Sequence, residues 1–242
     1  MTTLHALVTG ANRGLGAALA EALLSRDATV ALGLRQPTDE DGCRSLLRRH
    51  GNRGLIVRLD YADPDSIDEA ARRCEGELER IDLLVNCGAV NRDPSSPPTA
   101  SKGPLEQLDG AALTRMFVVN VVGPTLTCRA FLPLLKRSAA GQIANISTGR
   151  ASLGLVEDGR SMGYAVTKAA LNMATRKMAA ELAPAGVTVT AIDPGWVATR
   201  MGGPEAPSSA EETARHLVEL LLDGERRPSG EFVDRHGRRV PW

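Results

Sequence analysis

The chain has 242 residues and a mass of 25.6 kDa, with 29 basic and 29 acidic residues. A chain of this length buries about 70% of the surface that its unfolded form exposes, so packing can stabilise it without disulfides or a structural metal. A formal net charge of zero and a pI near 6.9 provide no basic field for nucleic acid, which we exclude as a partner. With 43% apolar and 24% charged residues, the composition excludes collagen-like, disordered and coiled-coil proteins.

The four cysteines predict neither a disulfide framework nor a metal site, because none forms a Cys-x-x-Cys pair and no histidine stands at zinc-ligand spacing. No run approaches 18 consecutive apolar residues, and residues 1–5 lack the basic and apolar regions of a signal peptide. We therefore expect a cytoplasmic protein with reduced thiols, no metal and no membrane partner.

Short apolar segments alternate with helical patterns along the chain. The first segment, residues 4–8, runs into a glycine turn that is followed by leucines at helical spacing. Asp63 and Pro64 fit the N-cap and the first position of a helix. Strands are predicted over residues 4–8, 29–34, 55–59, 81–85, 142–146, 187–192 and 231–233, and further helices over residues 64–79, 111–135, 164–182 and 210–222.

Strands that alternate with helices indicate a parallel sheet covered on both faces. The almost continuously apolar runs 83–85 and 187–192 fit strands that are buried on both sides. No repeat or long polar linker divides the chain, and the Pro- and Ser-rich residues 91–103 form the one long loop. We predict one domain over residues 1–242, an α/β Rossmann fold with a doubly wound parallel sheet of about seven strands.

Three glycines lie between the first strand and the first helix, at Gly10, Gly14 and Gly16. Such glycines let the backbone turn sharply and approach the pyrophosphate of a dinucleotide, whose charge lies at the helix N-terminus. The alternative explanation is a tight turn without a ligand. Because the three glycines lie between a strand and a helix, we favour dinucleotide binding.

The end of the second strand predicts which dinucleotide is bound. NAD sites usually carry an acidic residue there, whereas this strand ends at Arg35. Arg13 in the glycine turn adds a second guanidinium that could bind the 2′-phosphate of NADP. Both arginines could instead be solvated, and the acidic residues 39–41 leave NAD as the alternative. We favour NADP(H).

Tyr164 and Lys168 stand one helical turn apart and project from one face of a helix. A tyrosine normally titrates near pH 10, and a neighbouring ammonium favours its ionised form. An amphipathic helix with two unrelated polar residues is the alternative. The pair predicts acid–base chemistry when it is taken together with the other motifs of the chain.

Several motifs follow one another along the chain: Thr9-Gly10-x-x-x-Gly14-x-Gly16, Asp60, Asn86-Cys87-Gly88-Ala89, Asn120, Asn145-Ile146-Ser147-Thr148, Tyr164-x-x-x-Lys168 and Asp193-Pro194-Gly195. They occur in the order of the short-chain dehydrogenase/reductase family, which the chain resembles over nearly its whole length. Residues 194–203 and the ending from residue 231 are most similar to the C-factor and sniffer-like carbonyl reductases of that family.

The resemblance implies catalytic roles. Tyr164 would give a proton to the carbonyl oxygen of the substrate, and Lys168 would lower the pKa of Tyr164 and hold the nicotinamide ribose. Asn120 would hold a water in the proton relay, unless it only satisfies the backbone in a bent helix. The family has a Ser-Ser pair where this chain has Ser147-Thr148, so the register assigns the carbonyl-polarising hydroxyl to Thr148, with Ser147 and Ser152 as alternatives.

The resemblance also implies cofactor contacts. Asp60 would accept from the adenine amino group, Asn86 and Gly88 would line the adenosine side, and Thr199 would contact the nicotinamide amide or the pyrophosphate. The family usually has Asn-Asn-Ala-Gly where this chain has Asn86-Cys87-Gly88-Ala89. The other implied contacts are Asn12, Leu15, Tyr61, Pro194, Gly195 and Val197.

The predicted function is NADPH-dependent reduction of a small-molecule ketone or aldehyde to an alcohol. A dinucleotide-binding sensor or signalling protein of the same fold is the alternative from another class. Such relatives typically lose the Tyr or the Lys, and this chain has both. The resemblance also implies a homodimer or homotetramer.

Overall fold

The computed structural model of the chain describes residues 3–36, 40–92, 95–97, 103–224 and 228–242. Its centre is a seven-stranded sheet in the order β3-β2-β1-β4-β5-β6-β9, in which every neighbouring pair is parallel. This confirms the predicted doubly wound α/β fold. The strands are β1 (His5–Thr9), β2 (Thr29–Leu34), β3 (Gly54–Arg58), β4 (Leu83–Asn86), β5 (Gln142–Ile146), β6 (Thr188–Asp193) and β9 (Phe232–Asp234).

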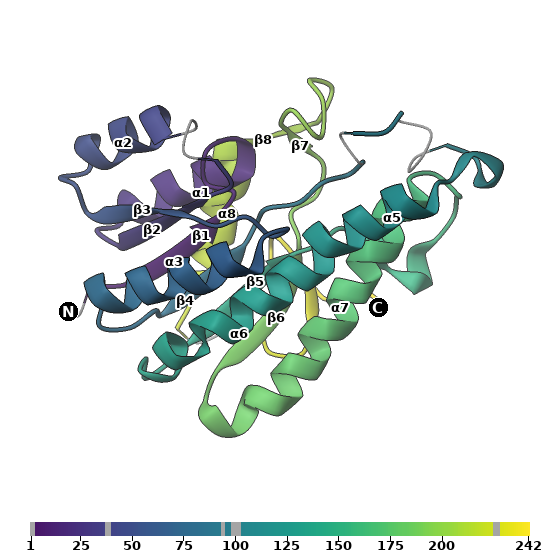
Figure 1. Ribbon diagram of the computed structural model, residues 1–242. Coiled ribbons are helices and arrows are strands. Elements are labelled where there is room, and N and C mark those ends of the chain that lie inside the picture. Colours follow the sequence, from purple (N-terminus) through teal and green to yellow (C-terminus); the bar gives the residue numbers. More distant parts are fainter. Residues whose placement is uncertain (1–2, 37–39, 93–94, 98–102, 225–227) are drawn as a thin grey trace.

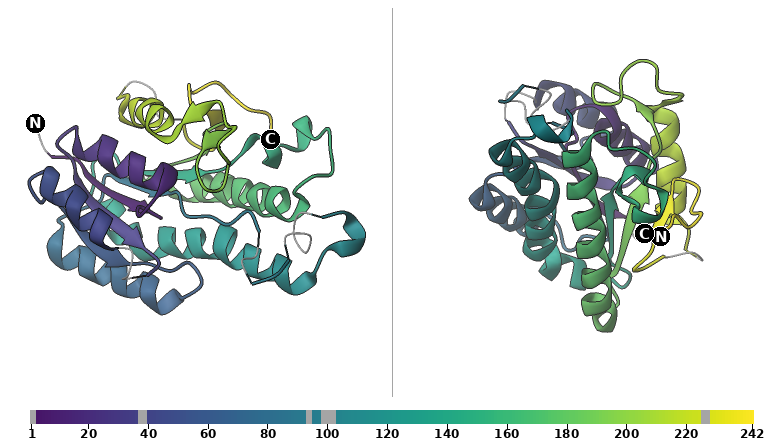
Figure 2. Two further views of the ribbon diagram at one scale, coloured as in Figure 1. Left: turned by 90° about the horizontal axis from the view of Figure 1, so that it is seen from above. Right: turned by 90° about the vertical axis from the view of Figure 1, so that its right-hand side faces the viewer.

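Helices cover both faces of the sheet (Figures 1 and 2). One layer contains α1 (Gly14–Leu24), α2 (Glu40–Arg49) and α8 (Ala210–Leu222), and the other contains α3 (Pro64–Glu77), α6 (Gly123–Lys136) and α7 (Met162–Leu182). Alternate residues of one strand serve the two layers: Ala6 and Val8 of β1 pack with α1 and α8, whereas Leu7 packs with α3 and α6. The core therefore lies on both sides of the sheet.

The strand order changes direction between β1 and β4, its neighbour on the other side. In open parallel sheets, ligands bind outside the carboxyl ends of the strands at such a point. The turns after β1 and β4 meet there, because a Cβ atom on Gly10 would lie 3.1 Å from the Cα atom of Gly88. The topology thus places the predicted dinucleotide turn beside the Asn86-Cys87-Gly88 segment.

The predicted long helix over residues 111–135 consists of α5 (Gly110–Phe117), a π-helical turn (Val118–Val122) and α6 in direct succession. By length and composition alone this segment, Gly110–Lys136, could cross a membrane. Its side chains Phe131, Leu134 and Leu135 instead pack in the core cluster shared with α3 and the sheet. The segment therefore serves as a core helix of this layer.

The remaining differences from the predicted elements are small. The strands predicted over residues 29–34 and 142–146 and the helix over 210–222 have the predicted bounds, and the other strands shift by one or two residues. Helix α3 ends at Glu77, two residues early. Helix α2 lies in a polar stretch that is compatible with a helix but for which no bounds were predicted, and the short pair β7 (Val197–Ala198) and β8 (Ser208–Ser209) was not predicted. The predicted loop 91–103 falls partly outside the described residues.

Candidate active site

The glycine turn after β1 is closed tightly on itself. Gly10 and Gly14 have positive φ angles of 66° and 54°, which favour glycine. A Cβ atom on Gly16 would lie 2.3 Å from the carbonyl oxygen of Gly10, so no larger residue fits between the turn and α1. Asn12, Arg13 and Leu15 stand in the same turn and are at most half-buried. A backbone cradle with glycines at its closest points, at the N-terminus of α1, fits the pyrophosphate of a dinucleotide.

Two arginines stand at the carboxyl edge of β1 and β2. Arg13 is the N-cap residue of α1 and Arg35 directly follows β2, and both are exposed. The acidic alternatives are placed differently: Glu40 forms an ion pair with Arg44 in the first turn of α2, and Asp39 lies outside the described residues. Of the two cations that were predicted to select NADP, Arg35 therefore stands at the end of the second strand and Arg13 in the turn after the first.

The predicted adenosine side combines one exposed polar contact, at Asp60, with buried ones around Tyr61. One carboxylate oxygen of Asp60 accepts from the amide of Ala62 at 3.0 Å. The hydroxyl of Tyr61 lies 2.6 Å from the Thr9 hydroxyl and donates to Asn86 Oδ1 at 2.9 Å. Tyr61 and Asn86 are 6% and 1% exposed, so their side chains serve the fold. Their places in a dinucleotide site stay predictions.

Lys168 projects from α7 into the interior, where it is 2% exposed. Its ammonium donates to the carbonyl oxygen of Ile146 at 2.7 Å, at the end of β5. Burial lowers the pKa of Lys168 to about 8, while the neighbouring Cys87 raises it. This lysine is therefore a weak acid near neutral pH.

Tyr164 lies one turn before Lys168 on α7 and is half-buried. Burial raises the pKa of its phenol above the ordinary value, and the charges of Asp193 and Cys87 raise it further. Lys168 was expected to lower the pKa of Tyr164, whereas the surroundings of this phenol raise it. In this arrangement Tyr164 is held in its protonated form, which is the form that donates a proton.

The three candidate hydroxyls differ in their surroundings. Ser147 is 2% exposed and donates to Asn172 Oδ1 at 2.6 Å, and Ser152 is fully buried and donates to the Trp242 carbonyl oxygen at 3.4 Å. Thr148 is half-buried, and in the described part of the chain its hydroxyl makes only one long contact, accepting from the amide of Arg150 at 3.4 Å. Thr148 thus has the hydroxyl that is least engaged by contacts within the described chain, and its place opposite a substrate stays a prediction.

Asn120 lies in the π-helical turn and is fully buried. Its side chain accepts from the amide of Val90 at 2.9 Å and donates to the carbonyl oxygen of Val90 at 2.8 Å and to the Thr167 hydroxyl at 3.0 Å. It therefore ties the segment after β4 to the helix that carries Tyr164. These contacts fit the alternative given above, in which Asn120 satisfies backbone groups. Its place in a proton relay stays a prediction.

The segment after β6 lies against the glycine turn. A Cβ atom on Gly14 would be 3.3 Å from the Thr199 methyl group. Val197 is buried in β7, Pro194 is buried beside it, and Gly195 adopts a φ of 77°. The structure thus brings the predicted contacts of this segment next to those of the first turn.

Sequence reasoning assigned no role to Cys87 or Asp193 beyond their motifs, yet the carboxylate of Asp193 raises the pKa of Tyr164, and burial raises the pKa of the Cys87 thiol to about 12. A signal existed for Asp193, because a carboxylate that directly follows an apolar strand also singled out Asp60. Cys87 gave no such signal.

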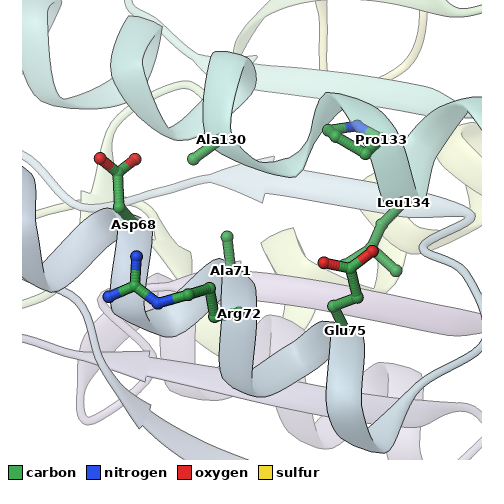
Figure 3. A pocket seen from close by; sticks show the side chains of 7 residues that line it. All are labelled: Asp68, Ala71, Arg72, Glu75, Ala130, Pro133 and Leu134. Atoms are coloured by element: carbon green, nitrogen blue, oxygen red, sulfur yellow. The ribbon is translucent and has the colours of Figure 1, made fainter.

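A surface groove lies away from the predicted site residues. Figure 3 shows a groove between α3 and α6, and none of its lining residues is a predicted site residue: Asp68, Ala71, Arg72, Glu75, Ala130, Pro133 and Leu134. Among the described residues, no group of three or more His, Cys, Asp or Glu side chains could hold a metal ion.

A glycine turn at the switch point, with a tyrosine and a lysine on an adjoining helix, defines a dinucleotide-binding oxidoreductase. The profile of the short chain dehydrogenase family matches residues 4–209. The chain therefore belongs to the short-chain dehydrogenase family, which uses nicotinamide dinucleotides.

Individual relatives agree with this assignment. The C-signal protein of Myxococcus xanthus is 37% identical over 138 residues, which are 57% of this chain and 83% of that protein. Carbonyl reductase Sniffer of D. melanogaster superimposes with a TM-score of 0.89 at 26% identity, and an NADPH-bound carbonyl reductase from chicken fatty liver with 0.87 at 28%. Each of these two likenesses covers 100% of both chains.

The lowered pKa of Lys168 predicts a pH dependence of stability. An unfolded lysine titrates near 10.5, so the unfolded chain binds more protons than the folded one between about pH 8 and 10.5. The free energy of unfolding should therefore rise through this window, by on the order of 3 kcal/mol from this residue. Urea unfolding at several pH values should show this rise, and Lys168→Met should remove it. Parallel pH curves for the two proteins would contradict the prediction.

Proposed function

We propose that the chain is an NADPH-dependent carbonyl reductase that converts a small-molecule ketone or aldehyde to an alcohol. The observation that supports this proposal is the packing of the helix that carries Tyr164 and Lys168 against the end of β5, directly beside Thr148. Helix α7 packs against the turn Gly149–Ala151, which directly follows Thr148, and Lys168 reaches the end of β5. A proton donor and a hydrogen-bond donor can therefore address one carbonyl oxygen.

Each side chain has a distinct task in this reaction. Tyr164, held protonated by its surroundings, gives its proton to the carbonyl oxygen. Thr148 donates a hydrogen bond to the same oxygen, where negative charge develops. Lys168 binds hydroxyl groups of the nicotinamide ribose through its ammonium. When bound, the reduced dinucleotide supplies the hydride that the substrate carbon accepts.

Preference for NADPH is supported by Arg13 and Arg35, whose guanidinium groups can bind a 2′-phosphate in a planar, bidentate geometry. The chicken carbonyl reductase that the chain resembles has NADPH bound in its structure. Because cells keep NADP mostly reduced, we propose reduction as the direction.

A second candidate is a dinucleotide-binding signalling protein, which the likeness to the C-signal protein favours. The presence of both Tyr164 and Lys168 supports the enzyme as the first candidate. We also propose a cytoplasmic location and a homodimer or homotetramer. Exposed apolar side chains on neighbouring helices support assembly: Val122, Val166 and Met173 are 44%, 45% and 62% exposed.

Oxidation of NADPH with a panel of aliphatic and aromatic ketones and aldehydes, run beside NADH, tests the function. Tyr164→Phe removes only the proton donor, so turnover should fall by on the order of a hundredfold or more while NADPH still binds. Absorbance at the nicotinamide band measures turnover, and fluorescence titration measures binding. Near-full activity of Tyr164→Phe would refute the assigned acid, and tight binding without turnover of any carbonyl would favour the signalling candidate.

Cofactor choice is tested by Arg35→Asp. Loss of a charge-assisted pair costs about 1.5 to 3 kcal/mol, so the affinity for NADPH should fall at least about tenfold and the affinity for NADH should change less. The control is Lys136→Asp, a charge reversal at the distant end of α6, which should leave both affinities unchanged. Equal affinities of the unmodified protein for NADPH and NADH would contradict the preference.

The substrate-facing hydroxyl is tested by Thr148→Val, which keeps the shape and removes the donor. The rate should fall by roughly 10² to 10³, the usual effect of deleting one donor to a developing oxyanion. Ser147→Ala should affect stability more than turnover, because the Ser147 hydroxyl is bonded to Asn172 in the interior. A larger loss of rate in Ser147→Ala than in Thr148→Val would reverse the assignment.

A further inference from the structure

Asp193, the last residue of β6, lies against the backbone of two different segments at the edge of the sheet. Its Oδ1 atom accepts from the amide of Gly195 at 3.0 Å. Its Oδ2 atom faces Gly149, where a Cβ atom would lie only 3.1 Å away, and the backbone of Gly149 acts to lower the pKa of the carboxyl group. Gly149 directly follows Thr148, and Gly195 opens the segment that leads to Thr199. One carboxylate thus joins the turn after β5 to the turn after β6.

Both segments have glycine at the position that faces the Asp193 carboxylate, Gly149 in one and Gly195 in the other. A Cβ atom on Gly149 would lie 3.1 Å from Asp193 Oδ2, closer than ordinary van der Waals contact allows. Gly195 has a φ of 77°, a conformation that residues with a side chain rarely adopt. Both backbone amides can therefore approach the carboxylate at close range.

We propose that Asp193 is a positioning residue that holds the Thr148 turn and the Gly195–Thr199 segment in one fixed relative position. This inference rests on the proposed carbonyl reduction, since it concerns the hydroxyl that polarises the carbonyl and the segment beside the glycine turn. Displacements of about 1 Å in such a constellation can cost a hundredfold in rate. The carboxylate contributes by fixing the distance between two parts of the site that lie on different strands.

The charge of Asp193 has a second consequence for the site. It lies near Tyr164 and, after burial, is the largest cause of the raised pKa of this phenol. The other charged groups that face Asp193 are Asp234, its partner in register on β9, and Arg235, which donates to the Ser208 hydroxyl at 2.7 Å. Asp193 therefore favours the proton-donating form of Tyr164 in addition to joining the two turns.

Three variants separate these effects. Asp193→Ala removes both acceptors, Asp193→Asn keeps one acceptor without the charge, and Gly149→Ala keeps the charge but crowds the contact. The control is Asp68→Asn, the same chemical change at an exposed carboxylate on α3. The measurements are kcat and KM with NADPH and the best carbonyl of the panel, amide hydrogen exchange at Gly149 and Gly195, and tyrosinate absorbance against pH. The chain has only two tyrosines, and Tyr164→Phe identifies the signal of Tyr164.

We expect Asp193→Ala to lower kcat about tenfold to a hundredfold and to speed exchange at both glycine amides. Gly149→Ala should change both in the same direction, and Asp193→Asn should give intermediate values with ionisation of Tyr164 at lower pH. Asp68→Asn should match the unmodified protein. If Asp193→Ala does not fold, Asp193→Asn and Gly149→Ala decide.

Unchanged kcat in these variants would overturn the proposal, whether or not the exchange rates change, because the contact would then be only structural. Unchanged exchange at both glycines would overturn it as well. If the unmodified protein reduces no carbonyl, the proposed function fails, and the exchange rates still show whether Asp193 joins the two turns.

Discussion

A chain of hydrogen bonds between buried polar side chains crosses the molecule beneath the carboxyl edge of the sheet and links the strand before the glycine turn to the helix that carries Tyr164 and Lys168. The Thr9 hydroxyl contacts that of Tyr61, Tyr61 donates to Asn86, Asn86 donates to Asn145 Oδ1 at 2.8 Å, and Asn145 donates to Thr175 at 2.8 Å. This chain of contacts joins the strands β1, β4 and β5, the turn that follows β3, and helix α7. A buried polar group left without a partner costs about 1–3 kcal/mol, so the chain of contacts fixes these elements together.

This chain of contacts gives the small residues of the edge a physical cause besides ligand binding. A Cβ atom on Gly123 would lie 2.2 Å from the Tyr61 Cβ atom, and one on Gly88 would lie 3.0 Å from its ring. The Tyr61 side chain therefore requires glycine at both positions in order to reach Thr9 and Asn86. The segment Asn86-Cys87-Gly88 follows from packing around Tyr61 as well as from the approach of a dinucleotide.

Local patterns predicted the layered fold because each strand is a short apolar run and each helix repeats its apolar face. They also predicted Gly10, Gly14 and Gly16 as a closed turn, since positive φ angles and close backbone approach admit only glycine. The partners of Asn120 and Ser147 could not be predicted, because Val90 and Asn172 lie 30 and 25 residues away and are brought near only by the register of the elements. The π-helical turn at Asn120 likewise follows from such contacts and left no periodic signal.

Side chains along a strand alternate between the two faces of the sheet, and this alternation determines the surroundings of Ser147 but not those of Thr148. Asn145 and Ser147 are two residues apart and both bond to α7, through Thr175 and Asn172, as a period of two requires. Ile146 packs into the cluster of the opposite layer, and Thr148 would follow it if the strand continued. The strand instead ends at Ile146, and Thr148, still extended at a φ of −165°, begins the turn Gly149–Ala151. Its side chain therefore stays at the edge of the sheet and half-exposed, because no further strand residue carries it beneath a helix.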